Sequence, residues 1–284
     1  MRRGETCGLV GPDGAGKTTT LRLLAGVVTP SAGGARVAGF DVAGQSEQVK
    51  GRVGYVAQRF SLYDDLTVGE NLRFFADLYG VPAGARGERE ERLLGFSRLG
   101  PFRDRLAQHL SGGMRQKLAL AVALMHEPEV LLLDEPTTGV DPVSRREFWQ
   151  LLNSLHSRGV TVLYSTPYMD EAERCDRVAF LAAGVLLAYG TVDELRRLLR
   201  GQVLELASDT PRRWQRLLAG LPFVQDAQAF GDKLHALVSG PEEEEALARA
   251  LSEAGSPTTP ERVEPSLEDV FMYLSRTPRE AGQE

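Results

Sequence analysis

The sequence has few cysteines, no excess of positive charge and no long apolar run, and each shortage excludes a class of protein. Cys7 and Cys175, its two cysteines, lack the C-x-x-C spacing of metal sites, which indicates a reducing compartment and no metal site. The net charge of −6 argues against a nucleic-acid partner. The longest apolar stretch, residues 178–189, is too short to span a bilayer. The first five residues contain no apolar core of a signal peptide, so we expect a cytoplasmic protein that reaches a membrane only through a partner.

The strongest motif is a phosphate-binding loop, Gly-Pro-Asp-Gly-Ala-Gly-Lys-Thr, at residues 11–18. A short apolar run at residues 6–10 predicts a buried strand before it, and residues 18–24 have helical character after it. The glycines let backbone N–H groups point at phosphate oxygens, and the helix adds its positive end. Lys17 supplies a charge for the β- and γ-phosphates, and Thr18 a hydroxyl for Mg²⁺. The predicted nucleotide-binding residues here are Gly11, Pro12, Asp13, Gly14, Ala15, Gly16, Lys17, Thr18 and Thr19.

The rest of the chain alternates short apolar strands with helices, which predicts an α/β fold. We expect strands at residues 35–40, 53–56, 130–133 and 160–165, a hairpin over 178–188, and helices over 67–79 and 90–99. The character changes near residue 201, where the order of elements becomes β-α-β-β-α. The sequence therefore predicts a large domain over residues 1–200 and a small C-terminal α+β domain over residues 201–284.

Two further clusters of polar residues carry chemistry. Ser111-Gly112-Gly113-Met114 reads as the start of a helix and as a second anion site. Asp134 and Glu135 follow an apolar strand, where one carboxylate suits Mg²⁺ and the other suits a general base for water. Asp141-Pro142 reads as the cap and first residue of another helix.

The order of these motifs resembles the ATP-binding subunits of ABC transporters over roughly residues 4–195, most specifically in LSGGMRQK and LLLDEP. The resemblance implies a P-loop NTPase fold with a helical signature subdomain, and ATP and Mg²⁺ as ligands. It implies that Gln58 contacts Mg²⁺ and senses the membrane subunits, that Asp134 holds Mg²⁺ and that Glu135 is the base. Each ATP then lies between two subunits of a homodimer or heterodimer. The residues implied to act on the nucleotide across that interface are Ser111, Gly112, Gly113, Met114 and Asp141.

Two segments resemble one subgroup of this family in particular. Residues 165–173, STPYMDEAE, and residues 266–271, SLEDVF, look like the corresponding parts of ABC-2-type exporters such as the daunorubicin-resistance ATPases. We therefore expect the ATP-hydrolysing motor of an exporter, held on the inner face of the plasma membrane by ABC-2-type permease subunits. The alternatives are a catalytically weak subunit that pairs with an active one and a soluble ABC ATPase, which usually has a second ATPase domain or a coiled-coil insertion.

The sequence departs from the family at two places. Pro167 stands where the family usually has a histidine that contacts the γ-phosphate, and proline offers no side-chain donor. The family also has one or two strands before the phosphate loop, with an aromatic residue that stacks on adenine. We therefore expect slow basal hydrolysis, and either an N-terminally shortened domain or a start site assigned too late.

Overall fold

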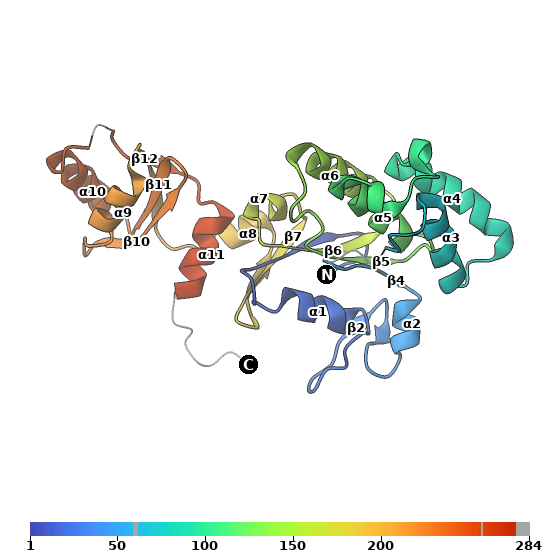
Figure 1. Cartoon of the computed structure of the whole chain (residues 1–284). Coiled ribbons are helices and arrows are strands. Elements are labelled where there is room, and N and C mark those ends of the chain that lie inside the picture. The colour runs from blue at the N-terminus through green and yellow to red at the C-terminus, as the bar shows by residue number, and fades with distance from the viewer. Residues whose placement is uncertain (59–61, 257, 277–284) are drawn as a thin grey trace. The chain divides into compact units, whose positions relative to one another are not determined.

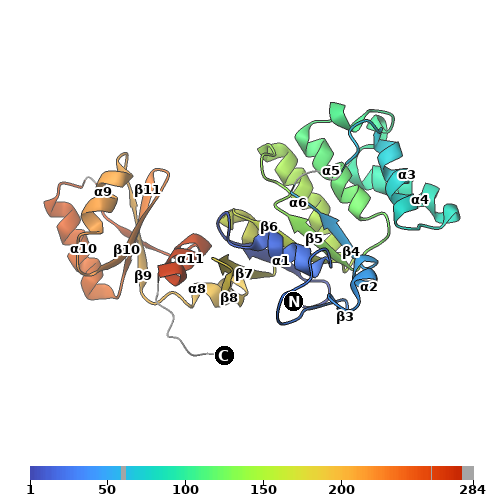
Figure 2. The ribbon, with the colours of Figure 1, turned by 60° about the horizontal axis from the view of Figure 1, so that its bottom comes forward.

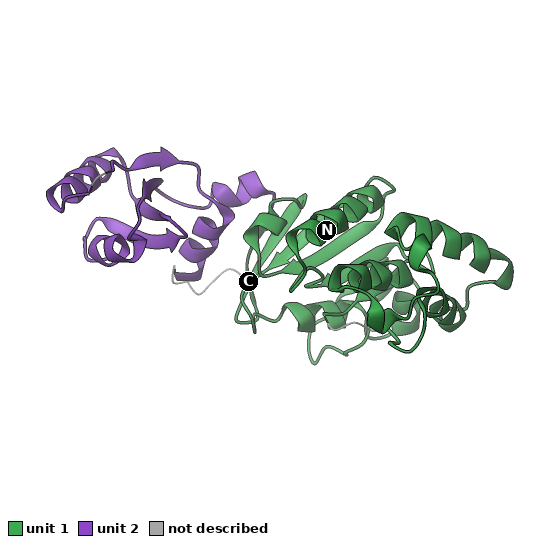
Figure 3. Cartoon of the chain, turned by 45° about the horizontal axis from the view of Figure 1, so that its top comes forward, with its two compact units in different colours: residues 1–189 green, residues 190–284 purple. Residues whose placement is uncertain are grey.

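The computed structural model describes residues 1–58, 62–256 and 258–276, and the chain divides into two compact units. Unit 1 is Met1–Tyr189 and unit 2 is Gly190–Glu284 (Figure 3). The sequence predicts a change of domain after residue 200, whereas the observed division comes earlier, just before helix α8 (Val192–Arg196). Residues 277–284 of the expected second domain lie outside the described residues.

Unit 1 is built on a sheet whose strands lie in the order β4-β5-β6-β1-β7-β8. These strands are β1 (Thr6–Val10), β4 (Val53–Val56), β5 (Val130–Asp134), β6 (Thr161–Thr166), β7 (Arg177–Ala182) and β8 (Val185–Gly190). Strand β1 pairs in parallel with β6 on one side and with β7 on the other. Every residue of β1 is buried, which explains why this strand lacks the alternation of a half-exposed one.

Helices cover both faces of this sheet, and the alternation of side chains along β5 decides which helices each face meets. Leu131 and Leu133 pack with side chains of α5 (Gly112–Ala123) and α6 (Pro142–His156). Leu132 packs on the opposite face with Leu21 of α1 (Lys17–Leu24). Figure 1 shows α1 and α2 (Ser46–Lys50) on one side of the sheet, with α5 and α6 on the other.

Helices α3 (Val68–Leu78), α4 (Ala83–Ser97) and α5 pack on one another beside the sheet, as Figure 2 shows. The α3 helix begins at the expected capping box, in which the side chains of Thr67 and Glu70 each accept the other's backbone N–H. The α4 helix begins earlier than the expected residue 90, directly after Pro82. Shorter helical turns complete the unit at Gly100–Phe102, Ala107–His109 and Met169–Ala172, the last being α7.

The single strand expected over residues 35–40 is instead a small hairpin. Its two strands are β2 (Arg36–Val37) and β3 (Phe40–Asp41), which pair antiparallel. Ala38 and Gly39 form the turn with φ angles of 50° and 86°. Two successive positive φ angles are typical of the tightest hairpin turns, and the alanine at the first position hides that signal in the sequence.

Unit 2 is an α+β unit whose strands lie in the order β10-β11-β9-β12. Its elements after α8 are β9 (Gln202–Ala207), α9 (Pro211–Leu218), β10 (Val224–Phe230), β11 (Lys233–Val238), α10 (Pro241–Glu253), β12 (Glu261–Val263) and α11 (Leu267–Arg276). The first five of these follow the expected β-α-β-β-α order. Strand β12 was not expected, because it is short and its first two residues are exposed and charged.

Helix α11, which contains most of the SLEDVF segment, is tied to the sheet of unit 2 by a charged cluster. Nδ1 of His235 lies 3.0 Å from both carboxylate oxygens of Asp269 on α11, and Nε2 lies 3.1 Å from Glu205 on β9. Burial disfavours the charged form of His235, but hydrogen bonds to Asp269 and Glu205 outweigh burial and raise its pKa.

Among the residues that the structure describes, no helix combines the length and the apolar character that a membrane crossing requires.

Candidate active site

A polar cavity of about 340 Å³ opens where β1 and β5 end at the carboxyl edge of the sheet. Seven of its lining residues come from the predicted loop, and Gln58 and Glu135 complete it. The loop residues are Asp13, Gly14, Ala15, Gly16, Lys17, Thr18 and Thr19. Residues far apart in the sequence thus meet at the edge where ligands bind to parallel α/β sheets.

The glycines of the loop serve different purposes. Gly14 and Gly16 have φ angles of 78° and 103°, a region that disfavours residues with a side chain. Gly11 is held by packing, because a Cβ atom there would lie 2.0 Å from the Leu181 carbonyl oxygen. Neither Gly11 nor Pro12 lines the cavity, although both were predicted to bind nucleotide.

Lys17 and Glu135 form a buried ion pair at the centre of the cavity. Nζ of Lys17 lies 3.0 Å from Oε1 of Glu135, and the two side chains are 3% and 7% exposed. The same ammonium donates to the carbonyl oxygens of Gly11 and Pro12 at 2.8 and 3.0 Å. Nε2 of Gln58 donates to Oε2 of Glu135 at 3.0 Å. The side chains of Lys17 and Gln58 therefore meet on the carboxylate of Glu135.

Asp134 accepts hydrogen bonds from hydroxyl groups on three different elements. Thr18 and Ser165 donate to its Oδ1 atom, each at 3.0 Å, and Tyr55 donates to its Oδ2 atom at 3.2 Å. Burial, together with the neighbouring Asp134, raises the pKa of Tyr55 and keeps its hydroxyl protonated. Asp134 is thereby fixed in orientation at the end of β5.

Ser165 and Tyr55 are the two site residues that the sequence analysis missed. Ser165 contacts both acidic residues, because its Oγ atom also accepts the Glu135 backbone N–H at 3.0 Å. Glu135 itself has a φ of 47°, so its backbone needs such support. The available signal was position: Ser165 comes from the strand next to β5 and lies opposite Asp134 in the register.

The second anion site forms as a helix start but does not line this cavity. Ser111 caps α5 by accepting the Met114 N–H at 3.3 Å. Asp141 caps α6 by accepting the N–H groups of Val143 and Ser144 at 3.1 and 3.0 Å. Hydrogen bonds from the side chain and backbone of Ser144 lower the pKa of Asp141. The side chains of Ser111 and Asp141 are both exposed.

Pro167 follows β6 and is partly buried, but it is not among the residues that line the cavity. Its two neighbours have polar groups that are engaged elsewhere. The Thr166 hydroxyl is buried and donates to Glu171 at 2.6 Å. The Tyr168 ring lies under the Arg145 guanidinium, 4.7 Å from its central carbon. The Thr166 hydroxyl therefore does not replace the side-chain donor that proline lacks.

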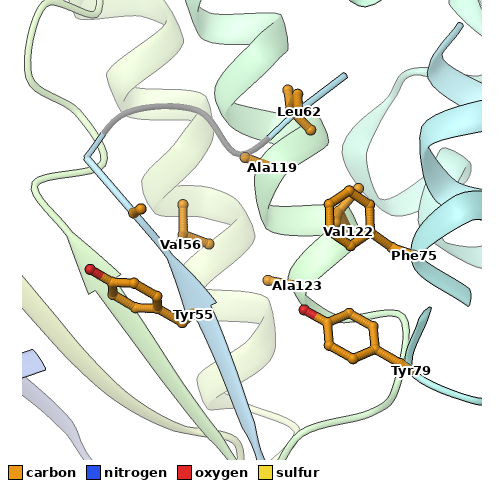
Figure 4. A pocket seen from close by; sticks show the side chains of 9 residues that line it. Tyr55, Val56, Leu62, Phe75, Tyr79, Ala119, Val122 and Ala123 are labelled. Carbon is orange, nitrogen blue, oxygen red and sulfur yellow. The ribbon is translucent and has the colours of Figure 1, made fainter. Parts of the chain in front are cut away.

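An apolar cavity of about 220 Å³ lies beside this site, between β4 and helices α3 and α5 (Figure 4). Phe75, Tyr79 and Val122 line it together with Ala57, the residue before Gln58. Phe74 and Leu78, also on α3, are exposed to 36% and 64%.

Comparisons with known proteins show which family the chain resembles. Residues 1–138 match the family described as ABC transporter, and residues 190–274 match the C-terminal domain of DrrA1-3-like ATP-binding proteins. Two curated relatives are the probable multidrug ABC transporter ATP-binding protein YbhF of Escherichia coli K12 and the Nod factor export ATP-binding protein I of Ralstonia nicotianae. The first is 45% identical over 84% of this chain and 42% of its own length. The second is 39% identical over 97% of this chain and 86% of its own. The chain thus spans less than half of YbhF.

Solved structures show the same relationship. An ATP-binding subunit of an ABC transporter is 34% identical, with a TM-score of 0.63 over 69% of this chain and 82% of the other. An ATP-binding cassette, solved as a dimer in a post-hydrolysis state with ADP and phosphate, is 26% identical, with a TM-score of 0.61 over 67% of this chain and 87% of the other. The fold is therefore the α/β fold of a P-loop ATPase, and the chain belongs to the ABC transporter ATP-binding proteins.

Proposed function

We propose that this chain is the ATP-binding and ATP-hydrolysing motor subunit of an ABC-2-type membrane exporter. The observation that carries the proposal is the meeting of Lys17, Gln58 and Glu135 in one cavity with the phosphate loop. The loop and α1 supply backbone N–H groups and the positive helix end to the phosphates, and Lys17 supplies a mobile charge.

The residues at the end of β5 fit a magnesium ion. Thr18 and Asp134 present oxygen atoms 3.0 Å apart, and Gln58 adds an amide oxygen at the same cavity. Oxygen ligands of this kind are those that Mg²⁺ prefers. We assign Thr18, Asp134 and Gln58 to the ion, which would neutralise charge on the phosphates.

Glu135 is the proposed general base. It lines the cavity beside Lys17, and Gln58 donates to its second oxygen, so its carboxylate is fixed in the cavity that we assign to the phosphates. Ser111, Gly112, Gly113, Met114 and Asp141 do not line this cavity, and we propose that they act on the nucleotide of a second subunit in a head-to-tail dimer.

The permease is the proposed membrane partner, and the apolar cavity of Figure 4 is where we expect one of its helices to bind. Phe74 and Leu78 are exposed on α3, the helix that supplies Phe75 to this cavity, and exposed apolar side chains of this kind are typical of an interface. Ala57 lines the cavity and is followed by Gln58, which donates to Glu135. A helix bound there would contact Ala57, and Ala57 is joined through Gln58 to the proposed base.

Phosphate release at saturating Mg-ATP tests the proposal. We expect Glu135→Gln to bind ATP and to lose hydrolysis by a factor of about 10² or more, because the amide keeps the shape and removes the base. Glu129→Gln is the matched control, since Glu129 pairs with Arg52 outside the cavity. Lys17→Ala should lose ATP affinity in calorimetry. Full turnover in Glu135→Gln contradicts the assignment.

The alternative, a catalytically weak subunit that pairs with an active one, is favoured by the surroundings of Pro167. The Thr166 hydroxyl donates to Glu171 and so does not replace the donor of the family histidine, while the Tyr168 ring stacks on Arg145. Restoring the donor with Pro167→His should raise turnover by about tenfold or more, by analogy with the loss of one oriented donor. Equal turnover in both proteins contradicts this interpretation of Pro167.

A further inference from the structure

The two glycines of the signature segment, residues 111–114, have different surroundings. A Cβ atom added at Gly112 would meet nothing within 4 Å. A Cβ atom added at Gly113 would lie 2.3 Å from Oγ and 2.4 Å from Cβ of Ser144 on α6. Real Cβ atoms do not approach other atoms this closely, so the start of α5 packs against Ser144 only because residue 113 is glycine.

Ser144 joins this contact to a second proposed site residue. Its backbone N–H donates to Oδ1 of Asp141 at 3.0 Å. The helices are linked again further along, where Lys117 of α5 pairs with Glu147 of α6. The signature segment and Asp141 therefore meet at one serine.

We propose that Ser144 is a positioning residue that holds the signature segment and Asp141 in one fixed arrangement, so that both reach the partner subunit's nucleotide together. The inference rests on the proposed function, in which both groups act across the dimer interface. It assigns Gly113 a packing role, distinct from direct contact with phosphate. Enlarging residue 113 moves Ser144, and Asp141 moves with it.

The test uses full-length protein carrying Glu135→Gln, in which an ATP-bound dimer should accumulate and can be measured by size-exclusion chromatography. Adding Gly113→Ala should weaken ATP-dependent dimerisation by at least about tenfold, because small misplacements of site groups have effects of this order. Adding Ser144→Gly to that variant should restore most of the loss, because it removes both atoms that the new methyl group meets.

Three controls separate this role from general damage. Ser144→Gly alone should weaken dimerisation less than Gly113→Ala does, because the backbone N–H of residue 144 can still donate to Asp141. ATP binding to monomers, measured by calorimetry, should be unchanged in every variant, because Gly113 and Ser144 do not line the cavity. Gly95→Ala changes a helical glycine at which an added Cβ atom would meet nothing within 4 Å, so this variant should behave as its parent.

The outcomes are distinguishable. If the Glu135→Gln parent forms no dimer with ATP, the proposed function fails, and the inference fails with it. If the parent dimerises and Gly113→Ala dimerises equally well, or if Ser144→Gly restores nothing, the inference alone is wrong. If Gly113→Ala also lowers the thermal midpoint, Ser144→Gly must restore the midpoint as well, because both effects have one cause.

Discussion

Removal of the Glu171 carboxylate should strongly destabilise unit 1. Glu171 is fully buried on α7. It accepts hydrogen bonds from the hydroxyls of Thr137 at 2.6 Å, Tyr164 at 2.8 Å and Thr166 at 2.6 Å, and Nε of Arg145 lies 3.5 Å away. The group therefore joins the segment after Glu135 to the end of β6.

The expected magnitude follows from the groups that lose their acceptor. Glu171→Ala leaves buried hydroxyls and the Arg145 guanidinium without the carboxylate, and removal of one partner of a buried ionic group costs about 3–5 kcal/mol. Glu171→Gln keeps one oxygen as an acceptor and an NH₂ group that can donate to Thr137, so it should cost about 1 kcal/mol.

Urea unfolding followed by tryptophan fluorescence measures both values. Trp149 lies 4.8 Å from the Tyr164 ring, ring centre to ring centre, and reports on unit 1. Trp214 is buried in unit 2, so the series is made in a Trp214→Phe background. If Glu171→Ala loses less than about 1 kcal/mol, or no more than Glu171→Gln, the hydroxyls find other partners and the reasoning is wrong.

Three further predictions concern separate parts of the chain. Ser165→Ala should lower ATP hydrolysis by about tenfold with little change in ATP affinity, because Ser165 orients both acidic residues; equal turnover refutes this role. Because the folded pKa of His235 is raised, its stabilisation of unit 2 is complete below its unfolded pKa of about 6.5 and is lost as the pH rises through the folded pKa. The thermal midpoint of unit 2 in the wild type should therefore fall as the pH rises through the folded pKa. His235→Gln should make the midpoint depend less on pH, and equal pH dependence in the two proteins contradicts this. Gly11→Ala should cost about 3 kcal/mol in urea unfolding, because its methyl group meets a β7 carbonyl, and Gly14→Ala, in open space, about 1 kcal/mol; similar losses count against the packing role of Gly11.

Local signals predicted most of the main elements. Capping boxes at Thr67 and Thr191 begin α3 and α8, and Asp141 caps the helix that begins at Pro142, as predicted. Such signals lie within a few residues of one another, so one sequence suffices to read them. The motif at residues 11–18 also predicted the strand, loop and helix that bring Lys17 and Thr18 to the cavity, because phosphate loops require this fixed arrangement.

Long-range contacts could not be predicted in the same way. Ser165 supports Asp134 only because β6 lies beside β5, and Tyr55 reaches the same carboxylate from β4. The packing of Gly113 on Ser144 depends on how two helices approach, which no residue pattern encodes. The Ala38–Gly39 turn was missed for a local reason, since alanine rarely adopts the positive φ found there.

The position of β1 between β6 and β7 has a consequence for synthesis of the protein on the ribosome. Thr6 pairs with Val162 and Cys7 with Arg177, so β1 is translated long before either neighbour exists. At about 5–20 residues per second, ribosomes need roughly 9–34 s to proceed from the end of β1 to the end of β7. Until then the Leu181 carbonyl, against which Gly11 packs, is absent. A nascent chain that has completed β6 therefore contains the entire phosphate-loop sequence but lacks β7, the strand against which Gly11 packs.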